Sequence, residues 1–490
     1  MAKVLLSTAA RLPFHTLRNL FPAVPPLGVQ ILGSVLEKSG HKVKIADVQH
    51  LKPLHKQFIL TIETFQPDVI SFTNNAMANA QSILNIATEV KKRFPHIHII
   101  AGGQFPTFSP QFFLSGKDII FDAVGLFQGE KVIAPLVDAV TNNLSLSDIP
   151  GIAYRGNNDT IIRTQSLPMF ESADDFPIPK WEKALKKASI CDGFAASIET
   201  LRGCPYECAF CSIPNYFGKQ PKYKSVDRII KELHILKKLG VREIFIIDDS
   251  FATNLKTARE LFKRMIEEDF QMRFSAQIRA DIVARHPDLI RLGAKAGLYL
   301  VVVGFEGYSA AVMTETEKKN TVSNNRKASK ILRQNNVAIF GTHIIGGPHT
   351  GLLDYFKTFF LGRHYSDIFR VTIYTPLFGS KKYHELLKEN KILSLDPQDY
   401  NYGSYVVKDE HNPIHIKLIY FTLQLLHYLL PGTIIKTFAS PNPITRIFNR
   451  RAYKGAFEFV IGTIVETLKI NLNKGTDKNQ CPQKAPDIPS

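Results

Sequence analysis

The sequence predicts an α/β protein in which a doubly wound, Rossmann-like domain precedes a partial barrel of six β/α units and a helical C-terminal tail. Short β-rich runs alternate with amphipathic stretches over about the first 142 residues, and a second series of the same kind begins at Ala195. A chain of 490 residues also exceeds what one core usually supports. We expect a first domain over 1–145, a linker over 146–190, a barrel over 191–385, a helical region over 386–472 and a disordered tail over 473–490.

The first series contains five short apolar runs separated by helical patterns. The strands are expected near 4–6, 42–47, 68–72, 96–101 and 123–125, and the helices near 27–39, 54–65, 78–94 and 130–140. This alternation is typical of a parallel sheet covered on both faces. Ligands of such sheets bind at the carboxyl ends of the strands, where small and polar residues follow at 71–75, 102–104 and 128–130. The glycines there could also simply form tight turns, since no G-x-G-x-x-G fingerprint is present.

The second series has clearer strands. They are expected at 196–200, 243–247, 272–277, 299–303, 338–342 and 370–374, with helices such as 226–239, 255–267 and 323–334 between them. Six units fall short of the eight of a closed barrel, so we expect an incomplete one with its active site at the C-terminal mouth. The segment between the two series, about 143–187, is rich in Asn, Asp and Pro and carries short strand patterns, which is typical of a linker.

Composition narrows the class of protein. Hydrophobic residues make up 44% and charged residues 21% of the chain, as in ordinary globular proteins. Five cysteines in this length do not form a disulfide framework, and the N-terminus has no apolar run of signal-peptide length, so we expect a cytoplasmic protein. The formal charge of +17 is compatible with nucleic acid, an anionic membrane, anionic cofactors or merely a solvated basic surface.

Three cysteines, Cys204, Cys208 and Cys211, lie in the loop after the first barrel strand. Three thiolates on one short loop can surround a soft metal centre. A structural zinc site would need a fourth ligand, and no histidine occurs between Cys191 and His234. Three protein ligands leave one metal position open, which favours a chemical role over zinc or a disulfide.

The spacing C-x-x-x-C-x-x-C, with Phe210 before the last cysteine, resembles the signature of the radical S-adenosylmethionine superfamily. The resemblance implies a [4Fe–4S] cluster on the three cysteines, reductive cleavage of S-adenosylmethionine, and an electron donor such as flavodoxin or ferredoxin. Later segments match in order and spacing. They imply that S-adenosylmethionine is bound near Phe210, Asp249, Gln277, Arg279, Glu306, Gly346 and Gly347.

With the doubly wound domain in front, residues 1–405 resemble the cobalamin-binding class of this superfamily, which includes magnesium-protoporphyrin ester cyclases and hopanoid methylases. The resemblance implies cobalamin contacts at Gly28, Ser71, Thr73, Gly102, Gly103, Gln104, Gly129 and Glu130. The chain departs from related patterns in three places. It lacks D-x-H-x-x-G, because His50 is wrongly spaced from Asp47; it has Pro348-His349-Thr350-Gly351 in place of a Gly-Glu-Thr continuation; and the loop at 71–75 is bulky.

The resemblance predicts a cobalamin-dependent methyltransferase that acts on unactivated carbon of a small apolar or tetrapyrrole-like molecule. Oxidative cyclisation or rearrangement without methyl transfer is the first alternative, and a non-catalytic iron–sulfur protein is the second. Methylthiolation of transfer RNA is disfavoured because residues 1–190 contain no cysteine for a second cluster, so no nucleic-acid partner is expected.

The apolar stretch from Ile414 to Leu430 falls outside the resemblance. It contains His415, Lys417 and His427 and is shorter than the roughly 20 residues that span a bilayer. It is expected to pack as a helix against the barrel or, next to the basic residues at 446–451, to lie on a membrane surface.

Overall fold

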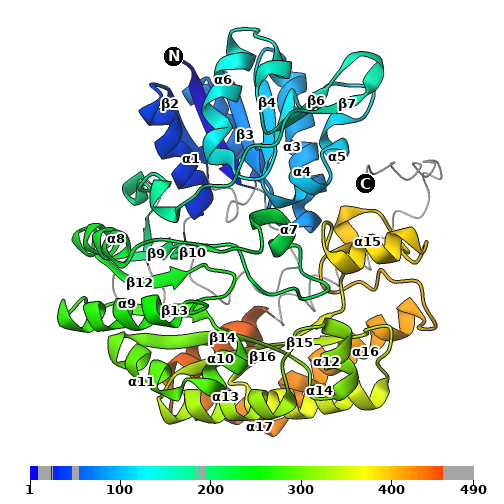
Figure 1. The fold of residues 1–490 in the computed structure, drawn as a ribbon. Coiled ribbons are helices and arrows are strands. Elements are labelled where there is room, and N and C mark those ends of the chain that lie inside the picture. The colour runs from blue at the N-terminus through cyan, green and yellow to red at the C-terminus, as the bar shows by residue number, and fades with distance from the viewer. Residues whose placement is uncertain (9–23, 25, 47–53, 184, 188–193, 456–490) are drawn as a thin grey trace.

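The molecule has two domains that lie one above the other in Figure 1, and each is built on a seven-stranded sheet. The computed structural model describes residues 1–8, 24, 26–46, 54–183, 185–187 and 194–455. The first sheet lies in the N-terminal part of the chain and the second in the part that starts at Phe194. Their arrangement confirms the predicted fold class, in which a doubly wound domain precedes a partial barrel and a helical C-terminal region.

The first sheet has the order β2-β1-β3-β4-β5-β6-β7. The first five of these strands are parallel, and β6 and β7 are antiparallel. The strands are β1 (Lys3–Thr8), β2 (Lys42–Ala46), β3 (Val69–Thr73), β4 (His98–Gly102), β5 (Ala123–Gly125), β6 (Ile152–Arg155) and β7 (Ile161–Arg163). The helices are α1 (Leu27–Lys38), α2 (Leu54–Phe65), α3 (Ala80–Arg93), α4 (Gln104–Phe108), α5 (Gln111–Leu114) and α6 (Ile133–Thr141).

Alternating side chains of β1 divide between two cores. Val4 and Leu6 pack with α1 and α6 on one face of the sheet, whereas Leu5 packs with α2 and α3 on the other. Because successive side chains of a strand point to opposite faces, an almost continuously apolar strand such as β1 needs cover on both. This is the physical reason for the doubly wound arrangement.

The first sheet continues past residue 145, the expected end of the first domain. The short strands expected in the linker are β6 and β7, and they pair in register with β5 and with each other, for example Val124 with Ala153 and Tyr154 with Ile162. The first sheet therefore extends to Arg163. A composition rich in Asn, Asp and Pro marked the turns of this segment but not the sheet to which it belongs.

The second sheet has the order β16-β15-β14-β13-β12-β9-β8, in which six parallel strands follow one another and β8 is an antiparallel edge. The end strands β16 and β8 are not neighbours, so the barrel is open. The strands are β8 (Lys186–Lys187), β9 (Phe194–Ile198), β12 (Val241–Ile246), β13 (Arg273–Gln277), β14 (Leu298–Glu306), β15 (Ala338–Ile345) and β16 (Ile368–Ile373). The helices are α8 (Val226–Lys238), α9 (Leu255–Glu267), α10 (Ala280–Arg285), α11 (Pro287–Ala296), α12 (Ala310–Thr316), α13 (Val322–Gln334) and α14 (Leu352–Tyr365).

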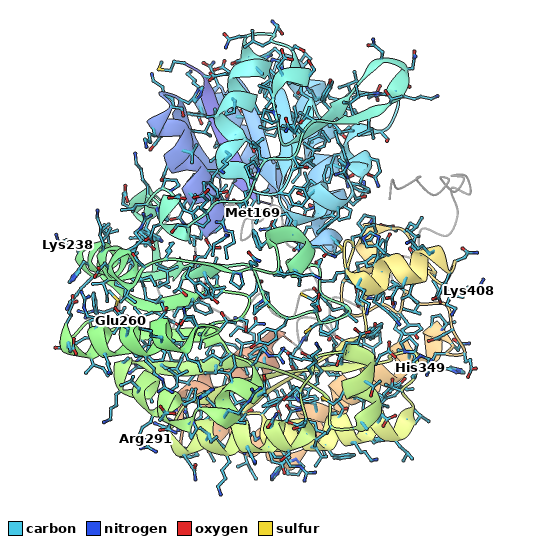
Figure 2. All side chains as sticks on the ribbon, viewed as in Figure 1. Met169, Lys238, Glu260, Arg291, His349 and Lys408 are labelled. Atoms are coloured by element: carbon cyan, nitrogen blue, oxygen red, sulfur yellow. The ribbon has the colours of Figure 1, made fainter. Side chains whose placement is uncertain are left out.

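These helices form the outer layer of the barrel. Polar side chains such as Lys238 of α8, Glu260 of α9 and Arg291 of α11 are drawn at the edge of the molecule (Figure 2). Their apolar sides join the largest core cluster, which contains Leu233, Leu261 and Leu289. The helical periodicity of this part of the sequence therefore predicted the packing correctly.

The C-terminal region begins with α15 (Lys381–Lys388) and continues with α16 (Pro413–Leu429) and α17 (Pro431–Phe438). Residues 443–455 are also helical. The predicted disordered tail at 473–490 lies outside the described residues. Within the described part of the chain, no single helix is long and apolar enough to cross a bilayer. Helices α16 and α17 reach that length and apolar composition only together, and they are bent by 54° relative to each other.

Candidate functional site

The cysteine loop leaves the first barrel strand through a small hairpin. After β9, Leu201–Arg202 form β10, which pairs antiparallel with β11 (Lys222–Tyr223), and the loop runs between them into α7 (Ile213–Phe217). The backbone N–H of Cys204 donates to the carbonyl of Gly218 at 3.4 Å, which closes the base of the loop. The predicted position at the C-terminal mouth of the barrel is thus the observed one.

Gly203 is the residue on which this turn depends. Its φ is +100°, and a Cβ at this position would lie 3.1 Å from the carbonyl oxygen of Gly218 and 3.3 Å from that of Phe217. Both the backbone conformation and the close approach of the hairpin therefore favour glycine immediately before Cys204.

The far half of the loop is tied to the rest of the barrel through its backbone. The N–H of Ala209 donates to the carbonyl of Thr316, at the end of α12, and its carbonyl accepts from Lys382 in α15. The carbonyl of Phe210 accepts from Leu377 at 3.3 Å, and its ring packs against the core beneath α16. These contacts hold the loop in one conformation without using the thiols.

The three thiols are partly buried and lie near one another. Burial raises the pKa of each, that of Cys211 to about 12, and neighbouring thiols raise the pKa values of Cys204 and Cys211 further. A group of buried thiols that resists ionisation needs a positive centre to become thiolate, as a soft metal centre provides. The donor set therefore fits an iron–sulfur cluster.

The thiols do not converge on one point. Across the described residues, no three His, Cys, Asp or Glu side chains are arranged to hold a single metal ion. A zinc ion would require its thiolates to lie about 2.3 Å from one centre. A cluster makes no such demand, because its cysteines ligate different irons.

Arg279, at the end of β13, lies against the cysteine loop. Its guanidinium stacks 3.7 Å from the ring of Tyr206 and donates to the Asp281 carboxylate at 2.9 Å and to the Lys318 carbonyl at 2.7 Å. It also hydrogen-bonds Cys208, which offsets part of the effect of burial on the pKa of that thiol. This buried cation thus faces the side of the loop that carries Cys208.

Glu306 ends β14 on the same side. Its backbone has φ +60°, unusual for a residue other than glycine, and the ammonium of Lys318 pairs with its carboxylate while donating to the Gly304 carbonyl. Lys318 lowers and Glu306 raises the pKa of Cys208, so both charges act at the loop. Backbone strain of this kind is common at functional sites.

Two consecutive aspartates follow β12 and have different environments. Asp248 is buried and accepts from the N–H of Thr200 at 2.7 Å and of Leu201 at 3.3 Å, so it anchors the turn that leads into the cysteine loop. Asp249 has no hydrogen-bond partner among the described residues. Burial, followed by the charges of Asp248 and Glu199, raises the pKa of Asp249 to about 7. Asp249 in turn raises the pKa values of Cys204 and Cys211, which places it beside the loop.

A cavity of about 290 Å³ lies between the two domains, next to the cysteine loop. From the first domain it is lined by the carboxyl ends of β3, β4 and β5 and the start of α1, and from the second by β10, α7 and the end of β12. All eight residues predicted to contact cobalamin line it, and they are Gly28, Ser71, Thr73, Gly102, Gly103, Gln104, Gly129 and Glu130. Asp249 lines it from the barrel side.

Small residues and aromatic ones both line the cavity. A Cβ on Gly28 would meet no atom within 4 Å, whereas one on Gly103 would lie 2.7 Å from the Asn74 carbonyl oxygen. The aromatic lining residues are Phe127, Tyr216 and Phe217. A cavity lined by small residues and aromatic rings fits a large, flat ring system. The described lining residues include no histidine.

Three side chains connect the domains around this cavity. Gln104 Nε2 donates to the Ser212 hydroxyl at 2.7 Å, and the Tyr216 hydroxyl donates to the Phe127 carbonyl at 2.9 Å. Arg202 donates to the Glu130 carboxylate at 2.8 Å. Gln128 adds a contact to Met169, which Figure 2 places at the boundary of the domains. Gln104 and Glu130, both predicted cobalamin contacts, are therefore also interdomain contacts.

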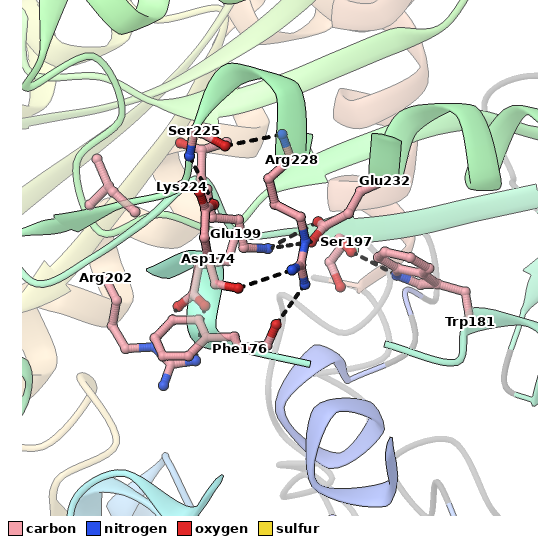
Figure 3. Close-up of polar contacts among 12 residues, drawn as sticks. Asp174, Phe176, Trp181, Ser197, Glu199, Arg202, Lys224, Ser225, Arg228 and Glu232 are labelled. Atoms are coloured by element: carbon pink, nitrogen blue, oxygen red, sulfur yellow. Dashed lines mark hydrogen bonds and ion pairs between the residues drawn. The ribbon is translucent and has the colours of Figure 1, made fainter. Parts of the chain in front are cut away.

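Arg202 is held by a buried group of side chains (Figure 3). It pairs with Glu199 at 2.9 Å, and its guanidinium stacks 3.9 Å from the ring of Phe176. Burial opposes its charge, but the carboxylates of Glu130 and Glu199 outweigh burial and raise the pKa of Arg202 above its ordinary value. The arginine is therefore a permanent cation two residues before Cys204.

A second buried network fastens the connecting segment to the barrel (Figure 3). Lys224 donates to both oxygens of Glu232 at 2.9 Å, and Arg228 bridges Glu232 to the carbonyls of Asp174 and Phe176. Trp181 Nε1 donates to the Ser197 carbonyl of β9 at 3.0 Å. The position of Phe176, and hence of the stacked Arg202, depends on these contacts.

The predicted S-adenosylmethionine residues do not all lie together at the cavity. Asp249 lines it, whereas Arg279 and Glu306 do not line it and instead act on Cys208. Gln277 is exposed at the end of β13. Gly346 and Gly347 are buried at the end of β15, where a Cβ on Gly346 would lie 3.0 Å from Ile416 of α16.

Arg202, Glu199, Tyr216 and Phe217 were not predicted as site residues. The sequence does contain a signal for Arg202, since it is a lone cation in the run Thr200-Leu201-Arg202-Gly203, directly before the cysteine motif. Tyr216 and Phe217 carried none, because an aromatic pair in a short helix is usually core.

Comparison with known protein families agrees with this geometry. The B12 binding domain matches residues 17–137, and the radical SAM superfamily matches residues 198–358. An uncharacterized methyltransferase of Pyrococcus horikoshii is 27% identical over 88% of this chain and 91% of its own length. An anaerobic magnesium-protoporphyrin IX monomethyl ester cyclase of Synechocystis is 24% identical, over 86% of this chain and 85% of its own.

Among solved structures, the cobalamin-dependent S-adenosylmethionine radical enzyme OxsB, determined with aqua-cobalamin and S-adenosylmethionine bound, superposes with a TM-score of 0.67 over 98% of this chain and 82% of that one. At 16% identity, this likeness concerns the fold alone.

The fold and the site define an α/β enzyme in which a loop of three thiols at the mouth of a partial barrel faces a cofactor cavity at the carboxyl edge of a doubly wound sheet. The chain contains a radical SAM domain and, N-terminal to it, a B12-binding domain. The predicted resemblance is thereby confirmed. The radical SAM domain implies a [4Fe–4S] cluster and S-adenosylmethionine, and the B12-binding domain implies cobalamin.

Proposed function

We propose that this enzyme transfers a methyl group to an unactivated carbon of a small apolar or tetrapyrrole-like molecule. One observation carries the proposal: the cavity lined by all eight predicted cobalamin residues is also lined by Asp249, whose charge acts on Cys204. The two proposed cofactor sites would therefore share a wall, and a molecule bound between them would be within reach of both.

The proposed ligands of the cluster are Cys204, Cys208 and Cys211. S-adenosylmethionine would be bound on the barrel side by Phe210, Asp249, Gln277, Arg279, Glu306, Gly346 and Gly347. Cobalamin would be bound in the cavity by Gly28, Ser71, Thr73, Gly102, Gly103, Gln104, Gly129 and Glu130.

When bound, the cluster supplies one electron that splits S-adenosylmethionine into methionine and a carbon radical able to remove a substrate hydrogen atom, and cobalamin supplies the methyl group. The chain's own residues orient and shield this chemistry. Gly203 sets the direction of the cysteine loop, Arg279 holds Tyr206 and Cys208, and the interdomain contacts around Arg202 help to keep water out of the space between the sites.

Similarity to the Pyrococcus protein, whose name describes a methyltransferase, supports methyl transfer because the match spans nearly the whole of both chains. Similarity to the Synechocystis cyclase supports the alternative, oxidative cyclisation without methyl transfer, over a comparable length. The presence of a B12-binding domain alone does not separate these two functions.

The proposal includes partners and a location. An electron donor of the flavodoxin or ferredoxin type would supply the single electrons, and the enzyme would act in the cytoplasm with peripheral contact to a membrane. The reducing setting is consistent with three free thiols on one loop.

Anaerobic reconstitution with iron and sulfide tests the cluster assignment. Wild type should bind iron and sulfide, show cluster absorbance and, with S-adenosylmethionine and reductant, release 5′-deoxyadenosine. Cys208→Ala should lose both properties, whereas Cys481→Ala, outside the motif, should keep them. An intact cluster that never cleaves S-adenosylmethionine would instead support a non-catalytic iron–sulfur protein, and bound zinc would refute the assignment.

The products distinguish methyl transfer from cyclisation. A methyl group lost from S-adenosylmethionine leaves S-adenosylhomocysteine, so a methyltransferase turning over a porphyrin or polycyclic apolar test substrate should release S-adenosylhomocysteine along with 5′-deoxyadenosine. Substrate-dependent 5′-deoxyadenosine without S-adenosylhomocysteine would favour the cyclase.

A further inference from the structure

An apolar surface covers three helices on the barrel side that faces away from the first domain. Of the 22 large hydrophobic side chains that are exposed among the described residues, eleven belong to α14, α16 and α17. Surface hydrophobic residues scattered singly are normal, but a concentration of this kind marks an interaction site.

Helix α17 has the reverse of the polarity of a soluble-protein helix. Its buried residues are Thr433 and Thr437, which are 2% and 0% exposed, whereas Ile434, Ile435 and Phe438 are 43%, 59% and 63% exposed. A helix bounded by water on its outer side would bury the isoleucines and expose the threonines. The exposed side of α17 is therefore apolar.

Polar side chains of α17 and of the end of α16 form hydrogen bonds with the C-terminal part of α14. Lys436 donates to the carbonyls of Arg363 and Ser366 at the C-terminal end of α14. Arg363 donates to Thr433 at 2.7 Å and to His427 at 3.1 Å. Since a cation at a helix C-terminus is favourable, these contacts fix α17 on α14 with its apolar side outward.

Helix α16 is apolar on two opposite sides. Ile416, Tyr420 and Leu423 are buried in the core over β15 and β16. Ile414, Leu418, Leu425 and Leu429 are exposed, and their spacing of four, seven and four residues places them in one stripe on the other side of the helix. The inner side belongs to the protein core, so lipid cannot surround this helix.

Helix α14 extends the same surface. Tyr355 and Phe359 join the core that also contains the inner side of α16, so both helices lie on one face of the sheet. Leu353, Phe356 and Phe360 of α14 are exposed, and the last two rings stack at 6.4 Å. Since α14 and α16 share one core and α17 is bonded to α14, the exposed sides of the three helices belong to one continuous part of the surface.

The basic charge of this region indicates which kind of partner covers the apolar surface. From His411 to Phe457 the sequence has no aspartate or glutamate but six lysines and arginines. Lys357, Lys417, Arg450 and Lys454 are exposed. Basic side chains beside exposed apolar ones suit an anionic lipid surface. A second copy of the chain would instead bring like charges together, which is unfavourable.

We propose that α14, α16 and α17 form a docking surface that inserts its exposed apolar side chains into the headgroup region of an anionic membrane, with α16 and α17 lying along the bilayer rather than crossing it. This surface is separate from the interdomain cavity. Binding does not depend on the proposed reaction, so the two can fail independently.

Flotation of the reconstituted full-length protein tests the proposal. Wild type should float with vesicles that contain phosphatidylglycerol, much less with phosphatidylcholine alone, and less again at high salt, because screening shortens the reach of the basic residues. Leu418→Ser/Leu425→Ser/Ile435→Ser should lower vesicle partitioning by at least about tenfold, since each side chain contributes by burial of apolar area. Leu60→Ser/Ile119→Ser/Leu144→Ser, exposed apolar residues of the first domain, should leave it unchanged.

A tryptophan reporter separates the other occupants. Trp181 is the only native tryptophan and is fully buried, so Leu425→Trp reports on the surface. Its emission should shift to the blue, and brominated lipid should quench it, only when anionic vesicles are added. A blue shift without vesicles that is independent of protein concentration would mean that the chain's own segment covers the surface. A shift that depends on concentration would mean a second copy, and either result overturns the proposal.

Discussion

Arg202 of the barrel donates to Glu130 of the B12-binding domain at 2.8 Å, and both side chains are only 7% exposed. Arg202 is separated from the first cysteine of the motif by Gly203 alone, and Glu130 lines the interdomain cavity. The same ion pair therefore joins the two domains and lies between the two proposed cofactor sites.

We predict that Arg202→Met lowers stability by about 3–5 kcal/mol, because it leaves Glu130 and Glu199 buried and unpaired. Glu130→Gln should cost less, since Arg202 keeps Glu199, and the double variant should cost less than the sum of the two. Urea denaturation of all three measures the coupling. The pair Arg155–Asp159, whose carboxylate is 79% exposed, is the control, where Asp159→Asn should cost at most about 1 kcal/mol. Additive effects at Arg202 and Glu130 would mean that the pair does not couple the domains.

Gly203→Ala should impair the cysteine loop. A positive φ and a 3.1 Å contact with the Gly218 carbonyl oxygen should together cost about 1–3 kcal/mol and reduce iron incorporation. Gly218→Ala, also at positive φ but with no atom within 4 Å of its Cβ, should cost less, and Gly351→Ala should be nearly neutral. Iron content after reconstitution and the unfolding midpoint are the measurements. Equal iron content in all three variants would contradict the prediction.

Gly28→Phe should fill the cavity without straining the fold. A Cβ there meets no atom within 4 Å, and replacing a glycine in the first turn of α1 should be neutral or stabilising by up to about 1 kcal/mol. Cobalamin retention on gel filtration should fall more than about tenfold, since a large ring would occupy the cradle. Gly351→Phe, at an open position away from the cavity, should retain cobalamin as wild type does. Unchanged retention in Gly28→Phe would refute the location of the cofactor.

Asp249→Asn should change how stability depends on pH. Burial and the neighbouring carboxylates raise the pKa of Asp249 from 3.8 to about 7, so the folded state binds more protons than the unfolded state between these values. The contribution of Asp249 is therefore present at low pH and is lost as pH rises through 7. The variant should be more stable than wild type above this range, by about 1–2 kcal/mol, and similar to it below pH 4.

Denaturation of the cluster-free protein across this range provides the measurement. Asp288→Asn is a control in which the pH dependence of stability should change in the opposite direction, because a hydrogen bond from Arg259 lowers the pKa of Asp288. Its removal should cost stability at neutral pH and have little effect in acid. The same sign in both variants would rule out burial as the cause at Asp249.

Local periodicity was sufficient for most elements. Helices α2 and α9 and strand β5 have the bounds that the sequence predicts, because apolar residues at a period of 3.6 or short β-branched runs are set within one element. The three cysteines could also be recognised from the sequence, since all of them lie within eight consecutive residues. Local patterns also placed the loops at 71–75, 102–104 and 128–130 at strand ends, which meet at one edge of a parallel sheet, whereas Gly28 of α1 came from the family resemblance.

What the sequence alone determined is therefore the two β/α series, the cysteine motif and the loops at one edge of each sheet, because each depends on neighbours in the chain. The tertiary structure decided the rest. The pairing of β6 and β7 with β5, the ion pair between Arg202 and a glutamate 72 residues away, and the outward isoleucines of α17 all depend on which distant segment packs against them. Such long-range partners are chosen by burial and charge over the whole fold, and no local period records them.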